Sequence, residues 1–219
     1  MLVGLIPAAG HATRLGHQPS SKEVISVGGR PVMDHLVQRM RAAQPDQLRV
    51  VTRPEKTDVV EHAHALGACV VLGHPADVAA SLRLGMAGLE DDDEVLIGFP
   101  DSLWEPEDGF VQVLARLRQG AEVALGLFGG GELERSDVVV RGPDDLVSRI
   151  EIKPEHPTGD VLWGIAATRV RALNGLVEGT EPGVLFNALA ERGVVVGVHL
   201  SSHWIDIGTP ETLQRVRDF

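Results

Sequence analysis

The chain has a single cysteine, no long hydrophobic run and few positive charges. Cys69 is the only cysteine among 219 residues, so no disulfide can form within the chain. Its apolar neighbours, Ala68, Val70 and Val71, predict a buried strand residue and not a nucleophile. No stretch approaches the roughly 18–20 apolar residues of a membrane span, and the first residues lack the basic segment of a signal peptide. We therefore expect a cytoplasmic globular protein with no membrane partner.

The small number of positive charges restricts the classes of ligand that the protein can bind. Lysine and arginine number 20 against 31 aspartates and glutamates, for a formal net charge of −11 at pH 7. Proteins that bind nucleic acid need an excess of basic residues on the contact face, so no nucleic-acid partner is expected. A phosphate ligand would need a local group of cations or a metal ion. The length favours one domain over residues 1–219. The sequence is compatible with a homo-oligomer.

The first stretch of the chain combines a buried strand, a narrow turn and two cations. Residues 2–6 are mostly apolar, which suits a strand buried on both faces. Pro7 ends this run before the small residues 8–10, whose backbone N–H groups can approach an anion closely. Arg14 and Lys22 add two positive charges. The stretch matches neither the GxxxxGK[ST] loop nor the dinucleotide GxGxxG pattern, yet its chemistry suits a polyphosphate.

Strands and helices alternate along the next part of the chain. We expect a helix from residue 32, helices over residues 55–66 and 77–89, and strands over 48–52, 68–72 and 94–99. This alternation is typical of a parallel sheet covered by helices on both faces. Beyond it we expect strands at about 121–128, 137–141, 146–153 and 161–168, helices at 169–178 and 182–192, and a strand at 194–199. The four strands with little helix between them predict a mixed or antiparallel extension, and Thr209 and Pro210 are suited to begin a last helix.

Asp101 follows the strand expected at residues 94–99. Ligands of open α/β sheets bind just outside the carboxyl ends of the strands, so a carboxylate at this place is well situated for function. The neighbouring acidic run over residues 90–93 is better explained as a solvated turn, because consecutive acids repel one another. Asp101 is therefore the first candidate for a catalytic or metal-binding carboxylate.

Several motifs together resemble the sugar-1-phosphate nucleotidylyltransferases, in particular the bacterial glucose-1-phosphate uridylyl- and thymidylyltransferases. They follow the order of that family along nearly the whole chain. The matching elements are Pro7-Ala8-Ala9-Gly10, Thr13-Arg14-Leu15, Ser21-Lys22-Glu23-Val24, Phe99-Pro100-Asp101, Ile152-Lys153-Pro154 and the segment from Trp204 to Glu211.

The resemblance implies a fold and a reaction. The fold would be an α/β, GT-A-like (Rossmann-like) three-layer sandwich with a mostly parallel mixed central sheet and a small antiparallel extension. The reaction would transfer a nucleoside monophosphate from UTP or dTTP to a sugar 1-phosphate and release pyrophosphate. Asp101 and Asp206 would share a Mg²⁺ ion, for which Mn²⁺ can substitute; carboxylate oxygens suit such hard ions.

The same resemblance implies roles for individual residues. Arg14 would bind the β- and γ-phosphates, Lys22 the α-phosphate and Lys153 the acceptor phosphate, as the catalytic cations. No side-chain nucleophile is needed, because an ionised phosphate is already one, so catalysis is positioning and electrostatic stabilisation. The expected substrate and nucleotide contacts are Pro7, Ala8, Ala9, Gly10, Thr13, Asp77, Ser102, Asp137 and Gly164.

Two departures from the family concern the acceptor. Relatives carry a glutamate directly before the Lys-Pro pair and a Tyr-Gly pair on the preceding strand, where this chain has Ile152 and Ser136-Asp137. Ile152 would make one wall of the acceptor pocket less polar, and Asp137 would make another wall more crowded. Such a pocket would favour an acceptor other than glucose 1-phosphate. Alternatives are a cytidylyltransferase that uses CTP and a smaller phosphorylated alcohol or phosphonate, and a non-catalytic nucleotide-sugar-binding domain. A glycosyltransferase is a weaker alternative, because Pro100-Asp101-Ser102 lacks the Asp-x-Asp of that class.

Overall fold

The computed structural model describes residues 1–12, 15 and 20–217. Two predicted site residues, Thr13 and Arg14, lie outside the described residues. None of the helices in the described part of the chain has the length and apolar character that crossing a bilayer requires.

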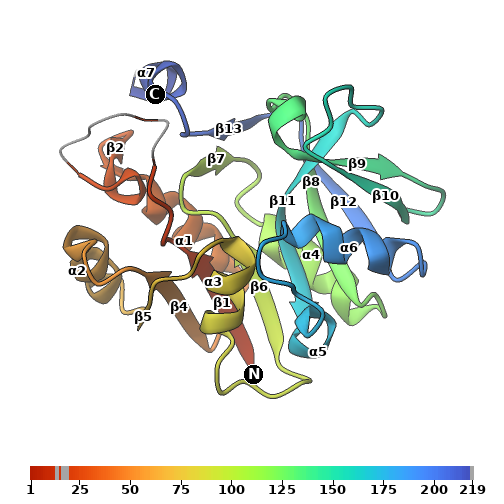
Figure 1. The fold of residues 1–219 in the computed structure, drawn as a ribbon, viewed down its shortest axis with the longest axis horizontal. Coiled ribbons are helices and arrows are strands. Elements are labelled where there is room, and N and C mark those ends of the chain that lie inside the picture. The colour runs from red at the N-terminus through yellow and green to blue at the C-terminus, as the bar shows by residue number, and fades with distance from the viewer. Residues whose placement is uncertain (13–14, 16–19, 218–219) are drawn as a thin grey trace.

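A mixed sheet of nine strands forms the centre of the molecule (Figure 1). Its order is β10-β9-β11-β6-β1-β4-β5, and β8 pairs with β11 and β12. β1 pairs in parallel with β4 and β6, whereas β11 runs antiparallel to β6, β8 and β9. The bounds are β1 Leu2–Pro7, β4 Gln47–Thr52, β5 Cys69–Leu72, β6 Glu94–Gly98, β8 Val123–Phe128, β9 Asp137–Arg141, β10 Val147–Ile152, β11 Val161–Arg169 and β12 Val195–Ser201.

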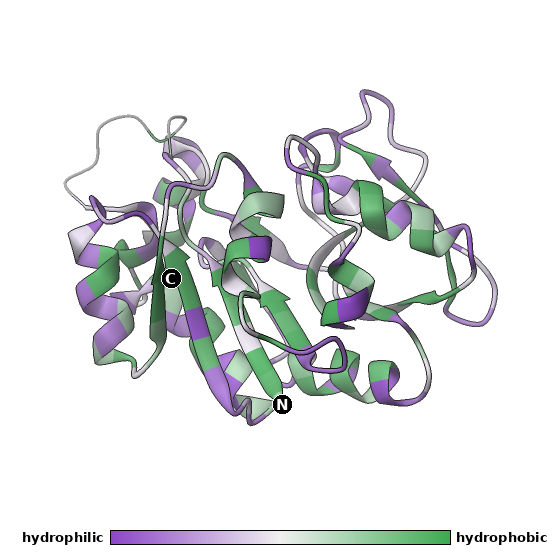
Figure 2. Cartoon of the chain, turned by 60° about the horizontal axis from the view of Figure 1, so that its bottom comes forward, coloured by the Kyte–Doolittle hydropathy of each residue, from purple (hydrophilic) through white to green (hydrophobic). Residues whose placement is uncertain are grey.

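Helices cover both faces of the sheet and bury two apolar clusters against it. Apolar side chains of α1, α2 and α4 pack on one face, and those of α3, α5 and α6 on the other. Figure 2 shows the strands as largely hydrophobic, in keeping with burial between two helical layers. The helices are α1 Val32–Ala42, α2 Thr57–Ala65, α3 Val78–Gly85, α4 Gly109–Arg118, α5 Val170–Leu173 and α6 Pro182–Ala190.

A third apolar cluster joins the two ends of the chain. Ile207, Leu213 and Val216, which lie in and before α7 (Pro210–Arg217), pack with Ile25 and Val27 near β2 (Ser26–Val27). β2 pairs with β3 (Arg30–Pro31), and a 3₁₀ turn, Lys22–Val24, precedes both; another spans Leu133–Arg135. The cluster holds the segment before α7 beside the segment that carries Lys22.

The predicted fold class is confirmed, with local differences. The helix α4 was not foreseen, and α5 has four residues where the sequence predicts a helix over 169–178. The expectation that Cys69 is buried is wrong: its side chain is exposed, because β5 is the edge strand of the sheet.

Candidate functional site

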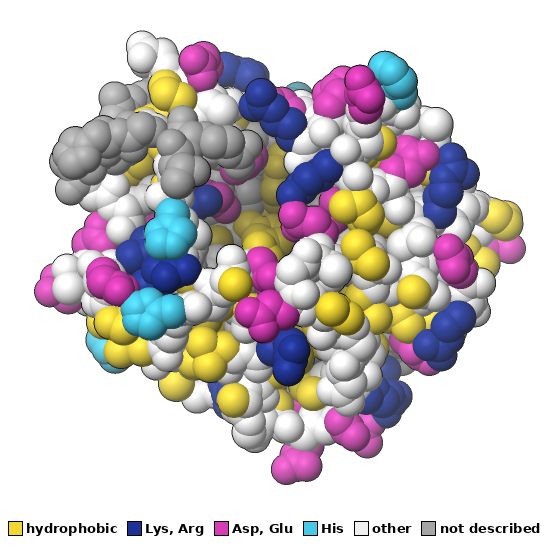
Figure 3. Space-filling model, viewed as in Figure 1, with side chains coloured by type: hydrophobic (Ala, Val, Ile, Leu, Met, Phe, Trp, Pro, Cys, Tyr) yellow, Lys and Arg dark blue, Asp and Glu magenta, His cyan; other side chains and the backbone are white. Residues whose placement is uncertain are grey.

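A cavity of about 220 Å³ lies outside the carboxyl end of β6. Side chains from both halves of the sheet meet around it, and Figure 3 shows a hollow in the middle of this face with acidic and basic side chains at its rim. Its walls hold five of the residues singled out in the sequence. The lining residues are Val78, Phe99, Asp101, Ser102, Arg135, Ser136, Asp137, Lys153, Leu162, Trp163, Glu181, Pro182, Trp204 and Asp206.

Asp101 and Asp206 are brought together by a pair of short strands. β7 (Ser102–Trp104) runs antiparallel to β13 (Trp204–Asp206), and Asp206 lies directly opposite Ser102. The backbone N–H of Ile207 donates to the Asp101 carbonyl oxygen at 2.8 Å. Two carboxylates far apart in the sequence therefore sit at neighbouring positions on one wall of the cavity.

Lys22 reaches the same place from the first loop. Its ammonium donates to the Asp101 carboxylate, and both side chains are mostly buried. Burial by itself would lower the pKa of this ammonium, but Asp101, then Glu23 and Asp206, outweigh that effect and hold the pKa above its usual range. A Cβ added to Gly10 would lie 4.0 Å from Lys22 Nζ. The narrow turn, Lys22 and the two aspartates thus form one polar group of the site.

Lys153 stands at the opposite wall of the cavity. Its ammonium forms an ion pair with Glu181, the residue that precedes α6. Lys153 has a φ of 42°, a left-handed conformation that is rare for a residue with a side chain, and more so before a proline. Strained backbone of this kind is concentrated at functional sites. The site therefore has a cation on each side, Lys22 near the turn and Lys153 across the cavity.

Asp137 lies in the wall of the cavity, near Lys153 and Glu181. Its Oδ1 is buried without a hydrogen-bond partner, as is the indole Nε1 of Trp163, and a Cβ added to Gly183 would lie 2.2 Å from its Oδ2. Burial, followed by the charge of Glu181, raises the pKa of the Asp137 carboxyl from 3.8 to about 6. The charge of Lys153 and the Gly183 N–H oppose that rise in pKa without cancelling it.

The turn at residues 7–10 begins where β1 ends. Pro7 is the last residue of β1, and the Ala8 N–H donates to the Val51 carbonyl at 2.8 Å, which extends the pairing with β4 by one residue. Ala8 and Ala9 are buried and Gly10 is exposed. The turn thus leaves the sheet at the same end as Asp101, because β1 and β6 are parallel neighbours.

Asp77 and Gly164, two of the contacts predicted from the sequence, do not line the cavity. Asp77 caps α3: its Oδ1 accepts from the Ala80 N–H at 2.8 Å and its Oδ2 from the Gly179 N–H at 2.5 Å. Gly164 is covered by an indole, since an added Cβ would lie 2.1 Å from the Trp204 ring.

Ile152, where the sequence predicts an apolar wall, also lies beside the cavity lining and not in it. Its side chain packs on the core cluster beside α6 and does not line the cavity. An added Gly183 Cβ would lie 2.9 Å from Ile152 Cδ1. Of the two departures from the family, Asp137 therefore lines the cavity, and the role of Ile152 stays a prediction. Ser102 does line the cavity, although its hydroxyl donates to the Phe99 carbonyl at 2.9 Å.

Sequence reasoning missed several residues of the site. Glu181 and Arg135 contribute charges to the cavity, and the rings of Trp163 and Phe99, 5.7 Å apart between centroids, form part of its apolar surface. The Glu-Pro pair at residues 181–182 marks a helix start, but no nearby residue signals that this helix start faces Lys153. The sequence therefore predicts that Glu181 lies at the start of a helix, and it does not predict the ion pair of Glu181 with Lys153.

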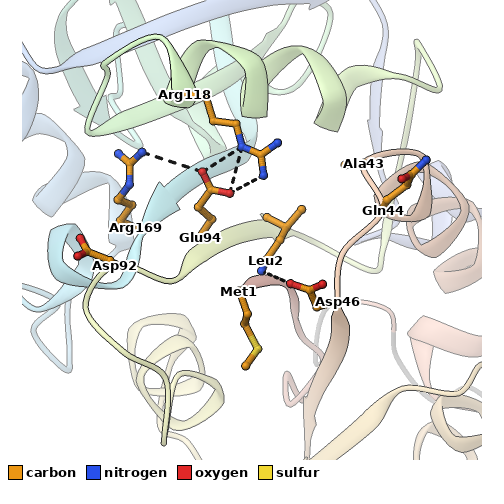
Figure 4. Close-up of a pocket in the computed structure, with 9 residues that line it drawn as sticks. All are labelled: Met1, Leu2, Ala43, Gln44, Asp46, Asp92, Glu94, Arg118 and Arg169. Carbon is orange, nitrogen blue, oxygen red and sulfur yellow. Dashed lines mark hydrogen bonds and ion pairs between the residues drawn. The ribbon is translucent and has the colours of Figure 1, made fainter.

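A second hollow, of about 490 Å³, lies at the opposite end of the sheet (Figure 4). It opens beside Leu2 and Glu94, the first residues of β1 and β6. Figure 4 shows Arg118 and Arg169 turned toward Glu94, at 2.6 Å and 4.0 Å. Because these charges satisfy one another, and because ligands of α/β sheets bind at the carboxyl ends, this hollow is the weaker candidate.

Comparison with known proteins assigns the chain to a family. A sequence profile of MobA-like NTP transferase domains matches residues 4–182. Among solved structures, a Bacillus anthracis protein provisionally assigned as a glucose-1-phosphate thymidylyltransferase, in complex with sucrose, is similar with a TM-score of 0.86 and 21% identity, over 100% of this chain and 94% of that one. At this identity the likeness shows the fold alone. A search of curated proteins found no significant match. Because the family profile covers well over half of the chain, the chain belongs to the MobA-like NTP transferase family, and the resemblance to sugar-1-phosphate nucleotidylyltransferases is confirmed at the level of the nucleotidyltransferase family.

Proposed function

We propose that this protein transfers a nucleoside monophosphate from UTP or dTTP to a sugar 1-phosphate and releases pyrophosphate, with residues 1–219 acting as one domain. The observation that carries the proposal is the meeting of Asp101, Asp206 and Lys153 around one cavity at the carboxyl end of β6, with the ammonium of Lys22 bound to Asp101. Cations and carboxylates gathered at one place suit two phosphate-bearing substrates and a metal ion.

The chemistry of the two aspartates suits Mg²⁺. Both donors are carboxylates, the ligand type that this ion prefers, and they occupy adjacent positions on one wall. Asp101 and Asp206 would be the protein ligands, with phosphate and water at the other positions. The ion would supply charge neutralisation for the triphosphate.

The remaining chemistry belongs to the cations. An oxygen of the acceptor phosphate attacks the α-phosphorus, a new P–O bond forms there, and the bond to the bridging oxygen of the pyrophosphate breaks. Lys22, which is charged and held beside Asp101, would bind the α-phosphate. Arg14, outside the described residues, would neutralise the leaving pyrophosphate, for which a guanidinium offers forked donors.

The acceptor would lie between Lys153 and Asp137. Lys153 would hold the acceptor phosphate by exchanging its exposed partner Glu181 for that group. Asp137 stands where relatives have a glycine, and its buried carboxyl narrows the wall that would face the sugar ring. We therefore propose an acceptor other than unmodified glucose 1-phosphate.

Pyrophosphate release tests the proposed function directly. ATP, CTP, GTP, UTP and dTTP are each combined with a panel of sugar 1-phosphates, phosphocholine and phosphonates in the presence of Mg²⁺. We expect the highest kcat/KM with UTP or dTTP and a sugar 1-phosphate other than glucose 1-phosphate. A preference for CTP with phosphocholine or a phosphonate would show a cytidylyltransferase instead. Absence of release with every pair would contradict a catalytic function.

Replacing Lys153 with alanine is expected to raise the KM for the acceptor about 10- to 100-fold and to leave the KM for the triphosphate within about twofold. A charge-assisted hydrogen bond contributes roughly 1.5–3 kcal/mol, which corresponds to that loss of affinity. Initial rates at varied acceptor concentration measure it. Arg141→Ala is a matched control, because Arg141 is an exposed cation paired with Asp160 at 3.1 Å away from the cavity. Unchanged acceptor kinetics in Lys153→Ala would refute this role.

A further inference from the structure

The three carbonyl oxygens of the narrow turn, at residues 8–10, all accept from cations in the segment between β4 and α2. Lys56 Nζ donates to the carbonyl oxygens of Ala8 and Gly10 at 2.9 and 3.1 Å. Arg53 Nε donates to the Ala9 carbonyl between them at 2.8 Å. Each carbonyl oxygen therefore points toward Arg53 or Lys56. A carbonyl oxygen that pointed at a triphosphate would repel it. In this arrangement none of the three points toward the side of the turn on which the triphosphate would bind.

Lys56 has no proton left for a ligand. Besides the two carbonyls, its ammonium donates to both oxygens of Glu23 at 2.7 Å. An ammonium has three hydrogens, and these four acceptors use them all. The Glu23 side chain is 0% exposed, and Lys56 is the cation beside it, so the pair neutralises itself. Lys56 therefore cannot act as one of the phosphate-binding cations.

The first turn of α2 holds the other side of the Lys22 segment as well. Asp58 accepts from the Ser21 N–H at 2.7 Å and from the Ser21 hydroxyl at 2.8 Å. Lys22 therefore lies between two residues, Ser21 and Glu23, that are both anchored to the start of α2. These contacts restrict the backbone of Lys22, whose side chain extends toward Asp101.

We propose that Arg53, Lys56 and Asp58, here called the α2 clamp, are positioning residues for the triphosphate. The α2 clamp holds the turn with its carbonyls away from the ligand and holds Lys22 beside the position of the α-phosphate. It acts through the turn and through Lys22 and touches no reacting atom. The proposal rests on the function proposed above for its role in the reaction, and on the contacts alone for its effect on the turn.

The test compares Lys56→Met with the double variant Glu23→Gln/Lys56→Met. The single variant leaves Glu23 buried without its cation and should be destabilised, whereas the double variant removes both charges and should recover most of the melting temperature. We expect both variants to raise the KM for UTP or dTTP about tenfold or more and to lower kcat, with the acceptor KM within about twofold. Amide hydrogen exchange over residues 8–12 and 20–24 should be faster in both variants. Arg118→Met removes a cation at the opposite end of the sheet. This control should change neither the kinetic constants for the triphosphate nor the amide exchange over residues 8–12 and 20–24.

The outcomes separate a positioning role from a structural one. If the kinetics recover together with the melting temperature in the double variant, Lys56 only stabilises the fold and the α2 clamp is overturned. Unchanged amide exchange in both variants would overturn it as well. If the parent protein transfers no nucleotide, the proposed function fails, and the exchange result still decides whether the α2 clamp holds the turn.

Discussion

Replacing Asp206 with asparagine is expected to lower the kcat of pyrophosphate release by on the order of 10³-fold, with a change in melting temperature below about 2 °C. Loss of one preorganised electrostatic group in an active site typically costs about 10²–10³-fold in kcat, and the loss of a metal ligand adds to it. Asp206 is exposed, so its replacement has little effect on folding. Initial rates at saturating substrates, with Mg²⁺ varied over several decades, measure the effect.

Asp101→Asn should show the same loss of kcat with a larger change in stability. Its carboxylate is mostly buried and pairs with Lys22, so the neutral amide leaves that ammonium with weaker compensation. Asp160→Asn is the matched control, because Asp160 is an exposed acid paired with Arg141 outside the site. Full activity of the parent in excess EDTA, or of Asp206→Asn at any Mg²⁺ concentration, would contradict the metal-binding role.

Replacing Asp137 with asparagine is expected to make the protein more stable at pH 7.5, by up to about 3 kcal/mol. The pKa of this carboxyl is raised from 3.8 to about 6 in the folded protein, chiefly by burial. Because one pKa unit corresponds to about 1.4 kcal/mol, keeping the group ionised costs the folded state about 3 kcal/mol at neutral pH. A neutral amide avoids that cost, although it places a new donor near the Trp163 and Gly183 N–H groups, which reduces the gain.

The gain in stability of Asp137→Asn over the parent should disappear in acid. The direction of this pH dependence follows from the number of protons that each state binds. Between pH 3.8 and about 6 the folded state holds more protons on Asp137 than the unfolded state does, so the free energy of unfolding falls as the pH rises through this window. Below pH 3.8 both states are protonated and the cost is absent. The difference between Asp137→Asn and the parent should therefore be largest above pH 6 and approach zero near pH 3.8.

Urea unfolding of both proteins at several pH values measures this difference. Asp160→Asn, at an exposed position, should show no comparable dependence on pH. A stability difference between the two proteins that does not change between pH 3.8 and about 6 would show that the pKa of Asp137 is not raised. A carboxylate that costs stability is expected where it serves a ligand, so the same variant should also change the acceptor KM.

The sequence by itself determined the alternating sheet and helix pattern, the turn after the first strand and the position of Asp101 at the end of β6. It also determined the start of α7 at Pro210. Each of these depends on preferences that act over a few residues: the periodicity of buried side chains, the small residues of a turn and the fixed φ of proline. Such signals are local, and the fold class follows from their order along the chain.

Only the tertiary structure decided which residues meet at the site. Asp206 reaches Asp101 because β13 pairs with β7, and Glu181 reaches Lys153 because α6 packs on β10. Ile152, the last residue of β10, packs against the core beside α6, whereas Lys153, the next residue, lines the cavity. Pairing and register between distant segments depend on how the whole chain packs, and no short stretch of sequence contains that information.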